Sequence, residues 1–304
     1  MLAILIPMYS LATLGSTVFA KITSSVMSGA SRAKYSLFLV INGFAACLLF
    51  WVMGGFSINA NLTTLIFSAM YAFIVAASLI LNRLAYAMAS VLGVNIIMYG
   101  CSLLCTSAMG IILFSEEISL LTVCRILIMM ASISATFVDA NRSDRVKSPQ
   151  ESVPNNARNT VKLCIVMVLI VIVSCADIVI LKYFTLNPNA TDETSFFFFT
   201  NVLLCLGSSC VLSFEAIIRR NEIGDVITIF KPRTIVGIVG NVLSSNVVSF
   251  LSVAIIALMN VSVYTPVVSA IGVLMGVVAS LIFREKLGVF SYVSAILALI
   301  AVII

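Results

Sequence analysis

The sequence has no histidine and few charged residues, and both absences restrict the chemistry that it can perform. Charged residues make up 10% of its 304 residues, whereas hydrophobic residues make up 62%. Histidine is the commonest general base and metal ligand. The chain also offers no catalytic Ser/Asp cluster and no metal-ligand spacing. We therefore predict that it is not an enzyme, has no catalytic residue, needs no cofactor or metal, and binds no nucleic acid.

The apolar content exceeds what a soluble protein of this length can hide from water. Apolar runs of about 20 residues recur along the whole chain, and that length matches the hydrocarbon core of a bilayer. The runs are continuous, which is typical of membrane helices. The sequence therefore predicts an all-α polytopic membrane protein.

The apolar runs divide into ten predicted transmembrane helices. Two runs, 62–114 and 234–283, are too long for one crossing, so we expect each to form two spans, with turns near Leu81-Asn82-Arg83 and Met259-Asn260. The polar segment 139–160 is predicted to be a linker. It separates two five-helix repeats, 1–138 and 161–304. The other six spans are predicted at 1–20, 35–54, 120–138, 161–181, 195–218 and 289–304.

The two predicted repeats share one layout, because each ends its long double run with a similar hexapeptide and then adds one span. The hexapeptides are Phe114-Ser115-Glu116-Glu117-Ile118-Ser119 and Phe283-Arg284-Glu285-Lys286-Leu287-Gly288. An odd number of spans per repeat inverts the second repeat relative to the first, as in many secondary carriers. Lysine and arginine gather in the odd-numbered loops, which places both termini outside by the positive-inside rule.

The layout and the two hexapeptides resemble the drug/metabolite transporter superfamily, in its ten-helix EamA-like branch. The architectural resemblance covers the whole chain, and the motif resemblance covers the hexapeptides. It implies a carrier of small solutes that works by alternating access, with a central cavity between the two halves. Many bacterial members of that family keep both termini in the cytoplasm, so the orientation indicated by the charges departs from the usual pattern. We expect this protein in the plasma (inner) membrane.

Asp177 is the strongest candidate for an ionisable site residue, because it lies well inside a predicted span. A carboxylate at that depth is costly unless it meets a partner or a wet cavity. It could bind a substrate amine or a coupling proton. The alternative is a carboxylate shielded by water and paired loosely with Lys182.

Uncharged polar residues at helical spacing are the other candidates for a substrate site. Asn95 and Tyr99 share one helix face, as do Asn241 and Ser245. Under the repeat, Tyr264 is the counterpart of Asn95, and Tyr71 could join them from the third span. The alternative is hydrogen bonding between packed helices. Other residues are predicted to be structural: Glu116, Glu117 and Glu285 to cap the last helix of each repeat, and Gly272, Gly276 and Ser280 to allow close packing.

These observations predict a secondary transporter, an exporter or an exchanger, of small neutral, zwitterionic or cationic metabolites. The expected partners are a small-molecule solute, protons as a coupling ion, and membrane lipid. The sequence is compatible with a monomer and with a homodimer. Phosphorylated anions are disfavoured, because they need arginine or lysine clamps. The alternative is a flippase of a lipid-linked intermediate, or its accessory subunit. Polar residues that face a side opening would favour that alternative.

Overall fold

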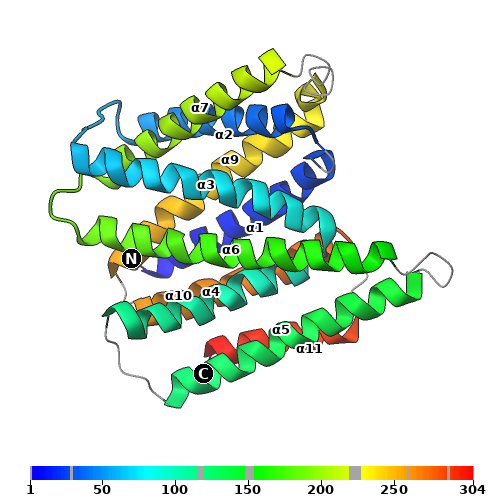
Figure 1. Cartoon of the computed structure of the whole chain (residues 1–304). Coiled ribbons are helices and arrows are strands. Elements are labelled where there is room, and N and C mark those ends of the chain that lie inside the picture. Colours follow the sequence, from blue (N-terminus) through cyan, green and yellow to red (C-terminus); the bar gives the residue numbers. More distant parts are fainter. Residues whose placement is uncertain are drawn as a thin grey trace. The chain divides into compact units, whose positions relative to one another are not determined.

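The computed structural model describes residues 2–27, 30–114, 120–147, 154–218, 227–258, 261–285 and 288–303. These residues form ten α-helices and one short 3-10 helix, and no strand occurs among them. Figure 1 shows the helices along the chain. Their bounds are α1 Leu2–Met27, α2 Arg32–Met53, α3 Leu62–Met88, α4 Val91–Phe114, α5 Leu120–Lys147, α6 Pro154–Leu186, α7 Glu193–Ile218, η2 Ile227–Phe230, α9 Pro232–Leu258, α10 Val261–Ile282 and α11 Val289–Ile303.

Six of the helices are long and apolar enough to cross a membrane, which makes the chain an all-α membrane protein. Exposed leucine, isoleucine, valine and phenylalanine side chains cover their outer faces, as expected for helices surrounded by lipid. Shorter apolar segments lie within α4, α5, α10 and α11. The six long apolar segments are Ile4–Met27, Arg32–Met53, Leu62–Met88, Val161–Leu186, Glu193–Ile217 and Thr234–Ile256.

The structure corrects one of the two predicted breaks in the long runs. The other, at Met259-Asn260, lies outside the described residues, between the last described residue of α9, Leu258, and the first of α10, Val261. The predicted turn near Leu81-Asn82-Arg83 is wrong, because α3 continues to Met88 and α4 begins at Val91. The break falls at Ala89-Ser90, where the Ser90 hydroxyl accepts a hydrogen bond from the Gly93 amide and caps α4. The turn was predicted at Arg83 because this residue is charged, but Arg83 lies inside α3.

Much of the predicted linker 139–160 is helical. α5 continues to Lys147, and α6 begins at Pro154. Proline suits the first turn of a helix, where its missing amide hydrogen is not needed. Within the predicted linker, residues 139–147 and 154–160 are thus helical, and residues 148–153 lie outside the described residues.

The described chain forms two compact units, and each unit combines segments of both predicted repeats. Unit 1 contains Met1–Ala87 and Ala176–Ala257, and unit 2 contains Met88–Cys175 and Leu258–Ile304. α6 contributes to both units, with its division between Cys175 and Ala176.

Unit 1 is held together by close helix packing at glycines. α2 packs along α7, and a Cβ atom at Gly43 would lie 3.0 Å from the Asn201 carbonyl oxygen and the Cys205 nitrogen. The Phe19 ring of α1 packs on Gly240 of α9, where a Cβ atom would lie 2.6 Å from the ring. Small residues let helix backbones approach closely, which is a main source of packing energy in membranes. An apolar core, built around Phe38 and Ile238, fills the unit.

Hydrogen bonds connect the α2–α3 and α6–α7 connections at one end of unit 1. The Ser195 hydroxyl accepts a hydrogen bond from the Asn59 amide at 3.0 Å, and the Thr64 hydroxyl accepts one from the Thr191 amide at 3.1 Å. Asn61 caps α3 through the Thr64 amide at 2.7 Å and also donates to the Asn189 carbonyl. These contacts pair the Asn59, Thr64 and Thr191 amides and the Asn189 carbonyl at that end.

Asp192 caps the start of α7. Its carboxylate accepts hydrogen bonds from the Ser195 amide at 3.0 Å, from the Ser195 hydroxyl at 2.8 Å, and from the Thr194 hydroxyl. Partial burial alone would raise the pKa of Asp192, but these hydrogen bonds outweigh it and hold the pKa below its ordinary value. The cap therefore favours the ionised carboxylate.

Unit 2 pairs α4 with α10 and α5 with α11. A Cβ at Gly272 would lie 2.2 Å from the Tyr99 ring, and one at Gly276 would lie 2.7 Å from the Asn95 side-chain nitrogen. The predicted role of these glycines in close packing is confirmed. α5 and α11 are joined by reciprocal hydrogen bonds, because the Ser132 hydroxyl donates to the Ser294 carbonyl at 2.8 Å and the Ser294 hydroxyl donates to the Ser132 carbonyl at 2.6 Å.

Candidate functional site

Two predicted site residues, Tyr71 and Asp177, meet in unit 1. The Tyr71 hydroxyl, on α3, hydrogen bonds to the Asp177 carboxylate, on α6. The Tyr71 ring is buried and packs against Phe196 and Phe197 of α7, with ring centroids 5.2 Å and 6.0 Å away. These aromatic contacts hold the ring, so its hydroxyl is positioned before any ligand arrives.

Tyr9 and Ser252 complete this group of side chains, which we call the Asp177 cluster (Tyr9, Tyr71, Asp177 and Ser252). Tyr9, on α1, is buried and shares a hydrogen bond with the Ser252 side chain on α9. Asp177 lies close enough for its charge to act on the Tyr9 hydroxyl. Four helices, α1, α3, α6 and α9, therefore place a carboxylate and three hydroxyl groups together inside apolar spans.

The Asp177 cluster has one acidic group, and no basic side chain of the described residues forms an ion pair with it. Among the described residues Asp177 forms no ion pair, and Lys182 does not pair with it. A membrane-buried carboxylate surrounded by hydroxyls can take up a proton or accept hydrogen bonds from an ammonium group.

Asn241 and Ser245 lie on α9 in the same unit. Both share a helix face with Ser252, at steps of four and seven residues along the helix. Asn241 is buried, and its side-chain nitrogen has no hydrogen-bond partner among the described residues. The Ser245 hydroxyl donates to the Val242 carbonyl at 3.4 Å, within its own helix. No described contact joins either residue to Asp177.

The other three predicted site residues, Asn95, Tyr99 and Tyr264, lie in unit 2, where two of them take part in helix packing. The Asn95 side chain donates to the Gly272 carbonyl at 3.2 Å, and the Tyr99 carbonyl accepts from the Ser269 hydroxyl at 3.1 Å. These hydrogen bonds connect α4 with α10, as the packing alternative expects. Tyr264 is buried near the start of α10.

Glu285 acts as a helix cap, but its described contact is with α4. The Glu285 carboxylate accepts a hydrogen bond from the Val91 amide at 2.9 Å, at the first residue of α4. The chain reaches this position through Arg284, whose φ of 50° is left-handed, and through a hydrogen bond from the Glu285 amide to the Ser280 carbonyl at 3.0 Å. That pattern is a Schellman ending of α10. The sequence predicts a cap on the last helix instead. Glu116 and Glu117 lie outside the described residues.

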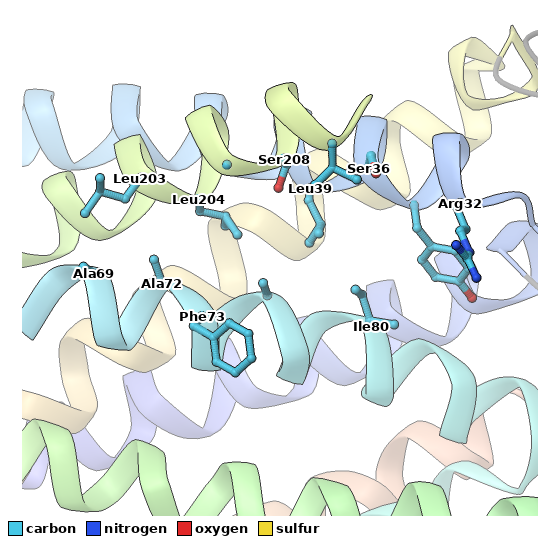
Figure 2. A pocket seen from close by; sticks show the side chains of 14 residues that line it. Arg32, Ser36, Leu39, Ala69, Ala72, Phe73, Ile80, Leu203, Leu204 and Ser208 are labelled. Carbon is cyan, nitrogen blue, oxygen red and sulfur yellow. The ribbon is translucent and has the colours of Figure 1, made fainter. Parts of the chain in front are cut away.

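A groove in unit 1 runs between α2, α3 and α7, and Figure 2 shows the side chains that line it. Its volume is about 610 Å³, within the range of about 300–1,000 Å³ that is typical of ligand pockets. Phe73 and Val211 line it and are 78% and 51% exposed, so its opening faces the surroundings of the unit. We call it the α2/α3/α7 groove. Its lining is mainly apolar, and the polar members are Arg32, Tyr35, Ser36 and Ser208.

The sequence prediction missed Tyr9, Ser252 and the burial of Arg83. Tyr9 and Thr13 lie four residues apart in the first span, the same signal that identified Asn95 and Tyr99, and Ser252 continues the face of Asn241 and Ser245. These residues could have been found from helical spacing. The burial of Arg83 could not have been found in this way. A single charged residue in an apolar run of 53 residues suggests a turn between two spans, and the turn was therefore predicted at Arg83.

Comparison of the chain with protein-family models and with curated proteins finds no match. In the described part of the chain no group of three histidine, cysteine, aspartate or glutamate side chains is placed to hold a metal ion.

Proposed function

We propose that the chain is a secondary carrier that moves small neutral, zwitterionic or cationic metabolites by alternating access. The Asp177 cluster carries this proposal. Placing a carboxylate in an apolar span costs free energy. In membrane proteins such groups commonly bind substrate or move protons. Here it lies beside two buried tyrosines and a serine on four helices, which suits a site that recognises an amine by charge and by hydrogen bonds.

The proposal extends to the ten-helix inverted repeat and to the drug/metabolite transporter superfamily. Two inverted repeats are related by a two-fold axis, so counterpart helices near that axis should contact each other. The contacts α2–α7, α4–α10 and α5–α11 join the second, fourth and fifth helices of the two predicted repeats. This pattern supports the repeat, although six helices alone meet the length and composition expected of a full span.

The binding role of Asp177 can be tested with the purified full-length protein. A panel of amino acids and amphipathic amines is screened by thermal unfolding, because a ligand of the folded state raises the melting temperature. For the strongest amine, Asp177→Asn should weaken binding by about 10- to 100-fold, the worth of a hydrogen bond to a charged group. Asp192→Asn makes the same chemical change outside the spans and should leave binding unchanged. Equal binding by both variants would contradict the proposed site.

Proton coupling is tested separately in proteoliposomes with the amine identified by that screen. An imposed pH gradient should drive uptake or counterflow of the amine in the wild type and in Asp192→Asn. Asp177→Asn should lose the response to the gradient, because an amide cannot exchange the proton. Gradient-driven transport that survives in Asp177→Asn would reject Asp177 as the coupling group.

The alternative, a flippase of a lipid-linked intermediate, is favoured by one observation. The α2/α3/α7 groove opens to the side of unit 1 and has serine and tyrosine hydroxyls in its lining. None of its lining residues belongs to the Asp177 cluster, so the two candidate functions depend on different residues. Movement of a fluorescent lipid between the leaflets of proteoliposomes, without any amine, would favour the flippase over the carrier.

A further inference from the structure

Two arginines lie at one end of the α2/α3/α7 groove: Arg32 lines it, and Arg83 lies beside it with two buried guanidinium nitrogens that have no hydrogen-bond partner among the described residues. Arg83 lies one helical turn after Ile80, which lines the groove on α3. Its guanidinium is positioned 5.2 Å from the Phe38 ring centroid of α2 and interacts electrostatically with Tyr35, another lining residue. Arg83 is 2% exposed. The buried nitrogen atoms Nε and Nη2 have no hydrogen-bond partner among the described residues.

Arg32 differs from Arg83, although both lie at this end. Arg32 begins α2, and its side chain is 77% exposed. It has an acidic partner, because its guanidinium lies 3.9 Å from the buried Glu215 carboxylate. Water and the Glu215 carboxylate can therefore compensate the positive charge of Arg32. In the part of the chain that the structure describes, Arg83 has an aromatic face beside it but pairs with no carboxylate, and a buried guanidinium needs hydrogen-bond acceptors for its donors.

We propose that the α2/α3/α7 groove binds an anionic phospholipid, with an acyl chain in the groove and the phosphate at Arg83. The lining suits an acyl chain, because alanine, leucine, isoleucine and phenylalanine dominate it and its opening carries exposed apolar side chains. Phosphate oxygens match the planar fork of an arginine guanidinium. The residues at Arg83 thus select the charge of the headgroup, and the groove selects the chain.

The charges near this end of unit 1 support an anionic lipid from the surrounding leaflet. Lys21 donates to the Tyr86 carbonyl at 2.9 Å, which places a further cation near the end of α3. Lys34 lies in the first turn of α2, two residues after Arg32. Basic residues at the membrane surface attract anionic lipids of the adjoining leaflet. Glu215 is the acidic group found at this end among the described residues, and it is already paired with Arg32.

Native mass spectrometry and thermal unfolding of the full chain in a neutral detergent test this proposal. Phosphatidylglycerol should remain bound and raise the melting temperature, whereas phosphatidylcholine with the same acyl chains should do neither. Arg83→Gln should weaken phosphatidylglycerol binding by about 10- to 100-fold, because it removes a charge-assisted hydrogen bond. Lys231→Gln is the matched control, since it removes an exposed positive charge that lies outside the groove lining, and it should retain binding.

A second variant tests the groove without touching its charge. A Cβ at Gly207 would meet no atom within 4 Å, so Gly207→Leu should fold and place its side chain in the groove. It should lose phosphatidylglycerol while its unfolding without lipid stays at least as stable, since leucine favours helix over glycine. The proposal is overturned if both lipids bind equally, if Arg83→Gln and Lys231→Gln behave alike, or if Gly207→Leu keeps the lipid. Stabilisation by inorganic phosphate alone to the same extent would also overturn it.

Discussion

Units 1 and 2 both contain polar residues at helical spacing, but they use them differently. In unit 2 the polar residues of α4 face glycines of α10, so Asn95 donates to a backbone carbonyl and Tyr99 packs over Gly272. In unit 1 the side chains of the Asp177 cluster interact with one another across four helices. The composition of the facing helix accounts for the difference. Glycine lets two backbones approach until a polar side chain reaches the neighbouring main chain.

Substitution of Gly272 should give the largest effect, because it tests the tight packing of unit 2 directly. Gly272→Ala would place a methyl group 2.2 Å from the Tyr99 ring, and overpacking of this kind costs about 1–3 kcal/mol. Gly207→Ala in unit 1 is the control, since open space surrounds that position, and it should stabilise its helix by up to about 1 kcal/mol. Thermal unfolding in detergent measures both. Equal melting temperatures would contradict the contrast in packing.

Loss of the Asp192 cap should have the second largest effect on the free energy of unfolding. Asp192→Ala removes three hydrogen bonds at the start of α7 and should cost about 1 kcal/mol of unfolding free energy. Because the pKa of Asp192 is lowered in the folded state, its contribution is complete above the ordinary pKa of about 3.9. The contribution is lost as the pH falls through the lowered, folded-state value.

The matched variant for the cap is Asp192→Asn. An asparagine side chain can still accept a hydrogen bond at an N-cap, so most of the stability at neutral pH should remain. Its unfolding should lose the acid dependence, because an amide does not titrate. Melting curves from neutral pH down to about pH 3, a range that includes the ordinary pKa of aspartate, measure the difference. An unchanged acid slope in Asp192→Asn would show that another group is responsible.

Removal of single tyrosine hydroxyls should distinguish the two units by ligand binding. Tyr71→Phe removes the hydrogen bond to Asp177 and should weaken binding of a cationic ligand by about the 0.5–1.5 kcal/mol of one hydrogen bond. Tyr99→Phe keeps the ring over Gly272 and the main-chain contact with Ser269, so binding should be unchanged. Isothermal titration with the amine identified by thermal unfolding gives both values. A larger loss in Tyr99→Phe would move the site to unit 2.

The smallest expected effect is at the serine pair of α5 and α11. Ser132→Ala removes one of the two reciprocal hydrogen bonds with the Ser294 main chain and side chain. Hydrogen bonds between membrane helices are worth about 0.6 kcal/mol on average. The melting temperature should therefore fall slightly, and transport should be unaffected. A drop as large as that of Gly272→Ala would mean that this pair dominates the packing of unit 2.

The sequence predicts the helical class and most helix positions well, because uninterrupted apolar runs have few structural alternatives in lipid. The predicted break at Met259-Asn260 lies outside the described residues. The break after α3 was not predictable, because the charge of Arg83 suggested a loop while the actual ending depends on the Ser90 cap. The helical residues within 139–160 likewise have a polar composition that suits both a linker and the ends of helices.

The candidate site was predictable in part. Asp177 stands out because a carboxylate inside a span is rare, and Tyr71 was named separately, as a candidate member of a set with Asn95 and Tyr264. The contact between Tyr71 and Asp177 was not predictable, because helix spacing determines which face a residue occupies but not which helix lies opposite. The same limit applies to Asn95 and Tyr99, whose spacing fits a binding face and a packing face equally well. Only the glycines opposite them decide between the two.

The left-handed backbone at Arg284 has a consequence for how two distant segments depend on each other. A residue other than glycine is rarely stable there, and a β-branched substitute would resist that torsion more strongly than arginine does. The chain would then leave α10 in another direction, and the carboxylate that follows would point away from the Val91 amide, which lies 194 positions earlier. The φ torsion of Arg284 thus determines whether the residue that follows α10 can cap the start of α4.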